Sequence, residues 1–375
     1  MKKVLPSTIN NVYLRFNHSN LQYIYKNIIN DRKFIHSYSD LFDPDKLAIL
    51  EKNLDIVEKK RAERFELLIK KVSPHIAQLK SVICNANSDL LPVGSLATGL
   101  AISNESDIDL VFIPSIENIE SFLNDFNDNS EFKKTFIKTA HKVIEKDINY
   151  KENIKSCGFL LHAKVPILQL ELKNGLKYDI QFCNSHSLRN TNLIRHYAAA
   201  DIRYRKLYIF VRTLAKKLNI INGRNGFLTS YQISLLVAHF LQTKYRKQQP
   251  VLPIIPKICC SALSPSITIE EVCKNLKNPV NVSAVTTHIN PNPSASYLAI
   301  QFVDYFANFN YKVNAIYMDK LLPEKSYGIR NYRKLQIFDT YSSKSISRGG
   351  MVIESLSQSM KYVIKSVRKL IFFIF

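Results

Sequence analysis

The sequence lacks the cysteine spacings that mark metal fingers and disulfide frameworks. It contains no CxxC pair and no other zinc-like spacing. Its six cysteines are Cys84, Cys157, Cys183, Cys259, Cys260 and Cys273. This pattern excludes a zinc finger and a secreted, disulfide-stapled scaffold, and it indicates a reducing compartment.

Long apolar runs and N-terminal acidic residues are also missing. No apolar segment reaches the roughly 18 residues needed to span a bilayer, and Leu370 to Phe375 is too short. We therefore expect a soluble chain with no membrane partner. No acidic residue precedes Asp31, as in some transit peptides, but this stretch has only one Arg and little Ser. We expect a cytoplasmic protein, with the nucleus and the mitochondrion as alternatives.

Basic residues outnumber acidic residues by a wide margin. The chain has 52 Lys and Arg against 31 Asp and Glu, a formal charge of +21, which favours a polyanionic partner such as nucleic acid. An AT-rich coding sequence would also inflate the lysine count, so charge alone does not decide the partner. With 375 residues, 46% of them hydrophobic, the chain suits two folded domains.

Helical periodicity is strong in two stretches of the sequence, one before residue 84 and one after residue 191. Apolar residues recur at steps of three and four from Asp43 to about Ile83, and Asp43 before Pro44 predicts an N-cap. Periodicity of this kind returns after Thr191. We expect further helices over 203–218, 230–242 and 296–309, and we find few periodic cues over 267–293.

Two strands are expected to carry three aspartates on one face of a sheet. Asp107 and Asp109 stand two residues apart at a strand predicted over 108–113, so both side chains leave the same face. Residues 164–183 alternate around Asn174-Gly175, which predicts a hairpin. Asp179 lies on its second strand, opposite the apolar side chains. Convergent carboxylates suit metal-assisted phosphoryl transfer.

A Gly-Ser pair precedes these strands. Gly94 and Ser95 open a short predicted helix whose N–H groups and hydroxyl suit a phosphate. A Gly-Ser pair or an Asp-x-Asp motif alone is weak, because an exposed Asp pair is more often solvated surface. The ordered combination is what points to chemistry.

In this order, the elements resemble the DNA polymerase β-like nucleotidyltransferase superfamily. Its pattern is Gly-Ser, then Asp-x-Asp on a strand, then a distant third Asp. The likeness is greatest to the terminal uridylyltransferases and cytoplasmic-type poly(A) polymerases. It covers roughly Leu91 to Pro253 and returns at LQIFDTYSSKSISRG, and it rests on VGSLATGLAISNESDIDLVF, AKVPILQLELKNGLKYDIQF, ADIRYRKLYIFVRTLAKKLNI and GFLTSYQISLLVAHFLQ.

The resemblance implies a role for each matching residue. Asp107, Asp109 and Asp179 would be catalytic and would bind two Mg²⁺ or Mn²⁺ ions. The remaining matches would hold the nucleoside triphosphate at its phosphates, its ribose and its base. These are Gly94 and Ser95 for phosphate, Asn190 and Thr191 for ribose, Arg212, Lys216 and Ser230 for the triphosphate, and Tyr231 for stacking on the base.

Plainer interpretations exist for two of these pairs. Arg212 and Lys216 are also compatible with the solvated face of an amphipathic helix, and Arg212 replaces the usual Lys while keeping its charge. Tyr231 is also compatible with a core tyrosine at a helix start. The uridylyltransferases use a histidine near a DPF-like segment against adenine, and the matching stretch, Asp339 to Arg348, contains none. We therefore leave the choice between UTP and ATP open.

The fold implied is α+β and bilobed, with a small mixed β-sheet nucleotidyltransferase (palm) domain and a helical PAP-associated domain. We expect an N-terminal extension at 1–42, helices packing with the C-terminal lobe at 43–82, the catalytic domain at 83–190 and the nucleotide-recognition domain at 191–375. The implied activity is template-independent addition of UMP or AMP to RNA 3′ ends. The alternatives are a sister enzyme making 2′-5′ oligonucleotides or cyclic dinucleotides, and an inactive RNA-binding adaptor. No zinc knuckle or RRM occurs, so RNA selection would rest on the basic surface or on an RNA-binding partner protein.

Overall fold

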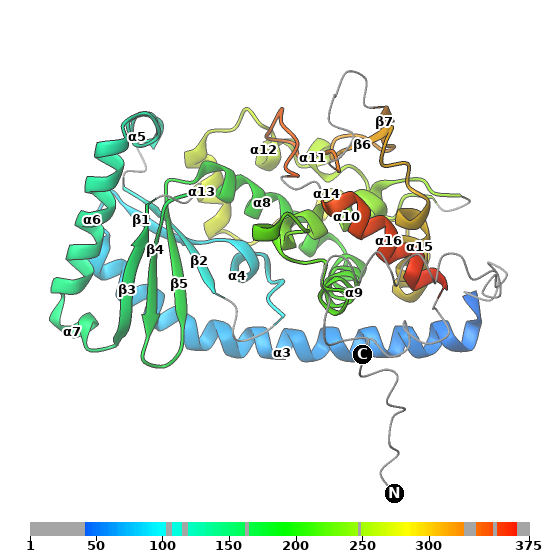
Figure 1. Cartoon of the computed structure of the whole chain (residues 1–375), viewed down its shortest axis with the longest axis horizontal. Coiled ribbons are helices and arrows are strands. Elements are labelled where there is room, and N and C mark those ends of the chain that lie inside the picture. Colours follow the sequence, from blue (N-terminus) through cyan, green and yellow to red (C-terminus); the bar gives the residue numbers. More distant parts are fainter. Residues whose placement is uncertain are drawn as a thin grey trace, which may run out of the picture.

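A small mixed sheet with covering helices stands beside a second, mainly helical part, and one long helix runs along both (Figure 1). The protein is described by a computed structural model over residues 42–102, 107–114, 119–161, 165–246, 249–325, 335–347 and 351–365. The expected extension at 1–42 therefore lies outside the described residues except for Phe42. The α+β class with a small mixed sheet and a helical region is confirmed.

The larger sheet has the strand order β1-β2-β5-β4-β3. Only β2 and β5 pair in parallel; the other neighbours are antiparallel. The predicted strand over 108–113 and the hairpin are confirmed, with Gly175 at a φ of +85° in the turn. The strands are β1 (Asp89–Pro92), β2 (Ile108–Ile113), β3 (Ile154–Leu160), β4 (Ile167–Leu172) and β5 (Lys177–Phe182).

Each face of this sheet packs on its own set of helices, because alternate side chains point to opposite faces. One face, including Leu110 and Ile180, packs with α3 (Pro44–Ile83) and α6 (Ser130–Lys146). The other face, including Val111 and Ile113, packs with α8 (Ser185–Ala200) and α13 (Ile269–Lys277). The catalytic candidates Asp109 and Asp179 share the second face.

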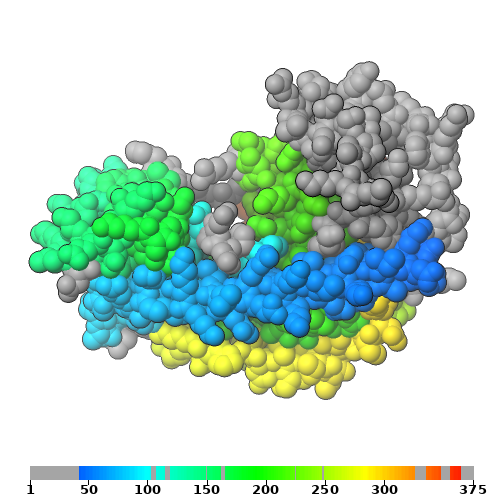
Figure 2. Space-filling model, turned by 90° about the horizontal axis from the view of Figure 1, so that it is seen from below, coloured from blue at the N-terminus to red at the C-terminus, as the bar shows by residue number. Residues whose placement is uncertain are grey.

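The long helix α3 divides its buried residues between the two parts of the molecule. The predicted cap is confirmed, since the Asp43 side chain accepts hydrogen bonds from two backbone N–H groups. Leu50 and Leu54 pack in the helical part, whereas Leu68, Val72 and Leu79 pack against the sheet. We expected 43–82 to pack with the C-terminal lobe; it spans both lobes, as Figure 2 also shows.

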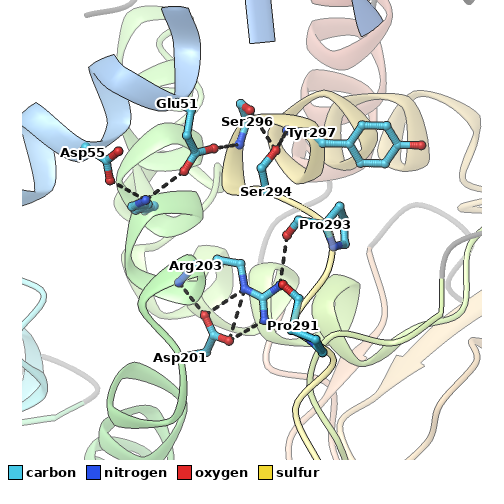
Figure 3. Close-up of polar contacts among 10 residues, drawn as sticks. Glu51, Asp55, Asp201, Arg203, Pro291, Pro293, Ser294, Ser296 and Tyr297 are labelled. Atoms are coloured by element: carbon cyan, nitrogen blue, oxygen red, sulfur yellow. Dashed lines mark hydrogen bonds and ion pairs between the residues drawn. The ribbon is translucent and has the colours of Figure 1, made fainter. Parts of the chain in front are cut away.

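The second part is built mainly from α9 (Ile202–Lys217), α10 (Ser230–Gln242), α15 (Ala295–Asn308) and α16 (Met351–Lys365). The first three are close to the helices expected over 203–218, 230–242 and 296–309, whereas α16 was not predicted. Figure 3 shows how α3 is fastened to it: Lys206 on α9 pairs with Glu51 at 2.8 Å, and Glu51 also accepts the Ser296 N–H at 2.7 Å. Arg203 donates to Asp201 and to the carbonyls of the loop before α15. No helix in the described ranges is long and apolar enough to cross a membrane.

Several elements have no counterpart among the predicted ones. Segments of four or five residues are too short to show a period, and α13 lies where few periodic cues were found. A second sheet, β7-β6-β8, adds strands to the part expected to be helical. The short helix α4 (Gly94–Thr98) was expected from the Gly-Ser pair. The elements without a predicted counterpart include α5 (Ile119–Asp128), α7 (Ile148–Lys151), the 3₁₀ helix η3 (Gly223–Asn225), α11 (Ile255–Ile258), α12 (Cys260–Leu263), α14 (Ser283–Thr286), β6 (Asn314–Tyr317), β7 (Glu324–Lys325) and β8 (Ile337–Phe338).

The buried carboxylate of Asp89 joins β1, α3 and α13. Asp89 at the start of β1 is 2% exposed and pairs with Lys80 on α3 at 2.5 Å and with Lys277 on α13. Burial alone would raise the pKa of Asp89, but the hydrogen bonds from Lys277 and Lys80 outweigh it and hold the pKa below its ordinary value. A lowered carboxyl pKa stabilises the folded state above the unfolded pKa, and this stability is lost as the pH falls through the folded pKa.

We expect Asp89→Asn to lower the free energy of unfolding by about 2 kcal/mol at pH 7, below the range for fully buried pairs because both lysines are partly exposed. The difference should shrink as the pH falls below about 4. Urea denaturation at pH 7 and pH 3 measures it. Glu171→Gln, which removes the partly exposed partner of Lys155, is the control and should change stability far less than Asp89→Asn, because surface ion pairs contribute little. An equal loss at both pH values would contradict the electrostatic explanation.

Candidate active site

The parallel pairing of β2 and β5 brings two of the three candidate carboxylates together. Asp109 and Asp179 are directly paired in the register of these strands. Asp107 lies one residue before β2 and is exposed, two positions from Asp109. The Asp179 carboxylate accepts a hydrogen bond from the Gln169 amide on β4 at 3.0 Å, which orients it. Residues 70 positions apart in sequence thus share one end of the sheet.

The three carboxylates act on one another electrostatically. Burial raises the pKa of Asp109 to about 7, and the negative charges of Asp179 and then Asp107 add to the effect. A carboxylate with such a pKa in the free protein has a strong affinity for a positive charge. The mutual repulsion of the three carboxylates indicates that they share one small region.

These residues fit a divalent cation of the magnesium class by chemistry. Carboxylate oxygens are the hard ligands that Mg²⁺ and Mn²⁺ prefer. Among the described residues, no three His, Cys, Asp or Glu side chains are already gathered closely enough to hold an ion. Because like charges separate when nothing neutralises them, we expect the aspartates to draw together only around a cation.

Gly94 forms a cradle directly against Asp109. Its φ of +62° suits glycine, and a Cβ built there would lie 2.7 Å from the Asp109 Oδ2 atom. The Gly94 N–H donates to the Thr191 hydroxyl at 3.0 Å, and the Val93 N–H donates to the Asp109 carbonyl at 2.9 Å. Ser95 follows as the second residue of α4. The Gly-Ser turn is thereby fixed beside the carboxylates.

The two candidate ribose contacts lie on the first half of α8. Thr191 is 4% exposed, and its hydroxyl oxygen is engaged by Gly94, so it positions the turn. The Asn190 Oδ1 atom is buried and has no hydrogen-bond partner among the described residues. Buried polar atoms are nearly always paired, so an unpaired one marks a place for a ligand or a water molecule.

The candidate triphosphate contacts come from α9 and α10. Arg212 is half-buried and Lys216 is exposed, one turn apart on α9. Burial raises the pKa of Tyr208, one turn before Arg212 on α9, while the charge of Arg212 and the hydroxyl of Ser230 at the start of α10 lower it. The structure therefore brings Arg212 and Ser230 together through a buried tyrosine, a link that the sequence pattern did not indicate.

Tyr231 belongs to a cluster that sequence reasoning only partly found. Its hydroxyl donates to Asp339 at 3.3 Å, and its ring packs partly on the helical core. Burial raises the pKa of Asp339, while the charge of His186 on α8 lowers it. His186, on an element distant in sequence, thus acts electrostatically on the segment Asp339 to Arg348, which has no histidine of its own.

Arg189 is a further residue that no sequence signal indicated. It precedes the candidate pair at 190–191 and lies over the ring of Tyr341, with 5.6 Å to the centroid. Its guanidinium also donates to the Ile267 carbonyl at 2.6 Å. Arg189 thus joins α8, the loop before α13 and the segment around Asp339. Arg348, at the end of that segment, lies outside the described residues.

The comparisons with known proteins find relatives over the part of the chain that carries these residues. Residues 45–199 match the family described as "Poly(A) RNA polymerase, mitochondrial-like, central palm domain". The chain is similar to the Caenorhabditis elegans protein "Poly(A) RNA polymerase gld-2", with 29% identity over 239 residues. That alignment covers 61% of this chain and 19% of the relative, so the chain spans about a fifth of the relative's length.

Solved structures show the same fold. The GLD-2/RNP-8 complex matches with a TM-score of 0.61 and 22% identity, covering 86% of this chain and 96% of the matched chain. The Cid1 poly(U) polymerase matches with a TM-score of 0.60 and 21% identity, covering 85% and 94%. The chain is thus similar in sequence to poly(A) RNA polymerases over its palm region, and it shares the fold of the GLD-2 and Cid1 structures.

Proposed function

We propose that this chain adds nucleotides to RNA 3′ ends without a template. The observation that carries the proposal is the placement of Asp109 between two further carboxylates and against the Gly94 cradle. A site of this kind attracts divalent cations, and the Gly94-Ser95 turn beside it is the position to which the family resemblance assigns a phosphate. The names of the relatives support an RNA polymerase that needs no template, and the charge of +21 suits an RNA substrate.

In the proposed reaction, the RNA 3′ hydroxyl attacks the α-phosphate of a nucleoside triphosphate and pyrophosphate leaves. Asp107 and Asp109 would hold two Mg²⁺ or Mn²⁺ ions and Asp179 one of them, to neutralise phosphate charge and activate the hydroxyl. The metal identity is part of the proposal, although one neighbouring structure was solved with Mg and 3′-dATP. Arg212, Lys216 and Ser230 hold the triphosphate, and the unpaired Asn190 Oδ1 accepts a ribose hydroxyl.

Two alternatives remain distinguishable. An inactive RNA-binding adaptor is disfavoured because all three carboxylates are present. A sister enzyme making 2′-5′ oligonucleotides or cyclic dinucleotides would use the same carboxylates, so we propose to separate it by its activator. Stimulation by duplex nucleic acid, with no extension of a single-stranded 3′ end, would favour the sister enzyme. One structural neighbour was solved as a complex with RNP-8, which supports a partner protein for RNA selection here.

We expect both UTP and ATP to be incorporated, with a bias of at most about a hundredfold. Tyr231 stacks on either base, and strong rejection requires polar groups that the wrong base leaves unpaired. Ser345 is not free for this task, because its hydroxyl accepts the Ile337 N–H and donates to the Leu335 carbonyl. Asp339 is itself bonded to Tyr231.

Single-nucleotide extension of a labelled RNA, with each NTP separately, gives kcat/KM for each base. A preference beyond roughly a thousandfold would show that another group reads the base, and His186 would then be the first residue to replace. The Asp109→Asn protein is the control and should extend RNA with none of the nucleotides. Extension that survives in this control would overturn the proposed function.

A further inference from the structure

A large cavity lies on the other side of the segment that holds Asp339. It measures about 920 Å³, within the range of small-molecule sites. One wall comes from α11 and α12, and the other comes from β6, β8 and residues 339–340 and 342–345. Its lining includes none of the residues assigned above to the incoming nucleotide, but it includes Asp339, which accepts the hydrogen bond of Tyr231. It is therefore a separate space that shares one loop with the proposed active site.

The wall of this cavity includes an aromatic platform. Tyr317 on β6 and Phe338 on β8 are paired in the parallel register of these strands. Their rings stack with centroids 4.7 Å apart and an interplanar angle of 7°. Both rings are only half-buried and both line the cavity. Flat, partly exposed aromatic faces are the surfaces on which single-stranded nucleic acids stack their bases, whatever the base.

Two lysines, the carboxylates of Asp319 and Asp339 and several hydroxyl groups make up most of the polar lining. Lys257 on α11 and Lys344 in the loop reach the cavity from its two walls, and both are exposed. Among the described residues, neither ammonium group has an ion-pair partner. The Thr340 hydroxyl, also in the lining, is buried without a hydrogen-bond partner in the described part of the chain. Stacking faces, two cations and an open hydroxyl match a nucleotide: base, phosphate and sugar.

We propose that this cavity binds a nucleotide of the acceptor RNA strand, with the base against Tyr317 and Phe338 and the backbone phosphates against Lys257 and Lys344. This inference rests on the proposed function, because it assigns the RNA strand of that reaction. The loop that contains Asp339 borders both the cavity and the proposed base-binding residue Tyr231. Asp339 bonds to Tyr231 on one side, so RNA in the cavity orders the loop that faces the incoming base.

The test measures RNA binding without any NTP, so that its result does not depend on catalysis. The probe is a fluorescent 15-nucleotide single-stranded RNA, titrated by anisotropy at several salt concentrations. The Lys257→Ala/Lys344→Ala double variant should weaken binding at least about tenfold and reduce the slope of log Kd against log salt by about two. Tyr317→Ala should weaken binding about five- to a hundredfold and leave that slope unchanged.

The controls separate a site from a general loss of charge. Lys155→Ala/Lys274→Ala removes two exposed lysines, on β3 and α13, that lie away from the cavity lining. Tyr317→Phe keeps the ring and should bind like the parent. Equal weakening in the control double variant, or unchanged binding in both cavity variants, would overturn the proposal.

The two proposals fail differently. If the parent protein adds no nucleotides but the cavity variants lose RNA, the cavity assignment stands and the proposed function falls. If the parent is active and the cavity variants show a raised KM for NTP with unchanged RNA affinity, the cavity serves a free nucleotide, and the assignment to RNA is wrong. A raised KM for RNA with unchanged KM for NTP is the result expected.

Discussion

Replacing Asp109 by Asn is expected to reduce nucleotide addition at least about a thousandfold while the protein stays folded. Asp109 lies between Asp107 and Asp179 and against Gly94, so its carboxylate is the centre of the proposed metal site. An amide of the same shape keeps the packing but removes the negative charge. Single-turnover extension of RNA with saturating NTP measures the loss in the chemical step.

The same substitution should not destabilise the metal-free protein. A carboxyl whose folded pKa is raised to about 7 favours the protonated form in the folded state. Its favourable contribution is fully present below the unfolded pKa of about 4 and is lost as the pH rises through about 7. With EDTA, Asp109→Asn should therefore match the parent in Tm at pH 4 and equal or exceed it at pH 8.

Asp125→Asn is the matched control, because it removes an exposed carboxylate of α5, outside this cluster. It should retain activity and leave the pH dependence of Tm unchanged. If Asp109→Asn extended RNA at near the parental rate, the metal assignment would be wrong. If it lost activity together with a large fall in Tm at pH 8, the loss would reflect structure and would say nothing for a metal site.

Replacing Gly94 by Ala is expected to lower kcat about a hundredfold, because the added Cβ would lie 2.7 Å from the Asp109 Oδ2 atom. Such an approach is too close for a methyl group, so the carboxylate must move. A displacement of about 1 Å in an active site costs an effect of this size. The positive φ of Gly94 adds strain of about 1 kcal/mol for any residue with a Cβ.

Gly175→Ala separates the two effects. Gly175 also has a positive φ, at +85°, but a Cβ there would have no neighbour within 4 Å. This control variant should lose similar stability and keep its activity. Measuring kcat and Tm for both proteins tests the cradle: equal kcat values would show that the close contact with Asp109 does not matter.

Local chemistry decided the elements that the sequence predicted well. The Asp43-Pro44 cap, the Asn174-Gly175 turn and the strand over 108–113 each depend on residues a few positions apart, and the structure confirms all three. The candidate aspartates were found for the same reason, since i, i+2 spacing on a strand fixes their shared face. For the nucleotide contacts, the family resemblance supplied what periodicity does not show.

Only the tertiary structure decided how these pieces meet. The contacts of Asp109 with Asp179, of Gly94 with Thr191 and of Tyr231 with Asp339 join residues about 70 to 108 positions apart. The same holds for Arg189 over Tyr341 and for the cavity beside Tyr317. No local pattern encodes such contacts, because they follow from which strands pair in parallel and which helices pack on each face. The sequence by itself thus determined the chemistry of the site, and packing between distant segments determined its geometry.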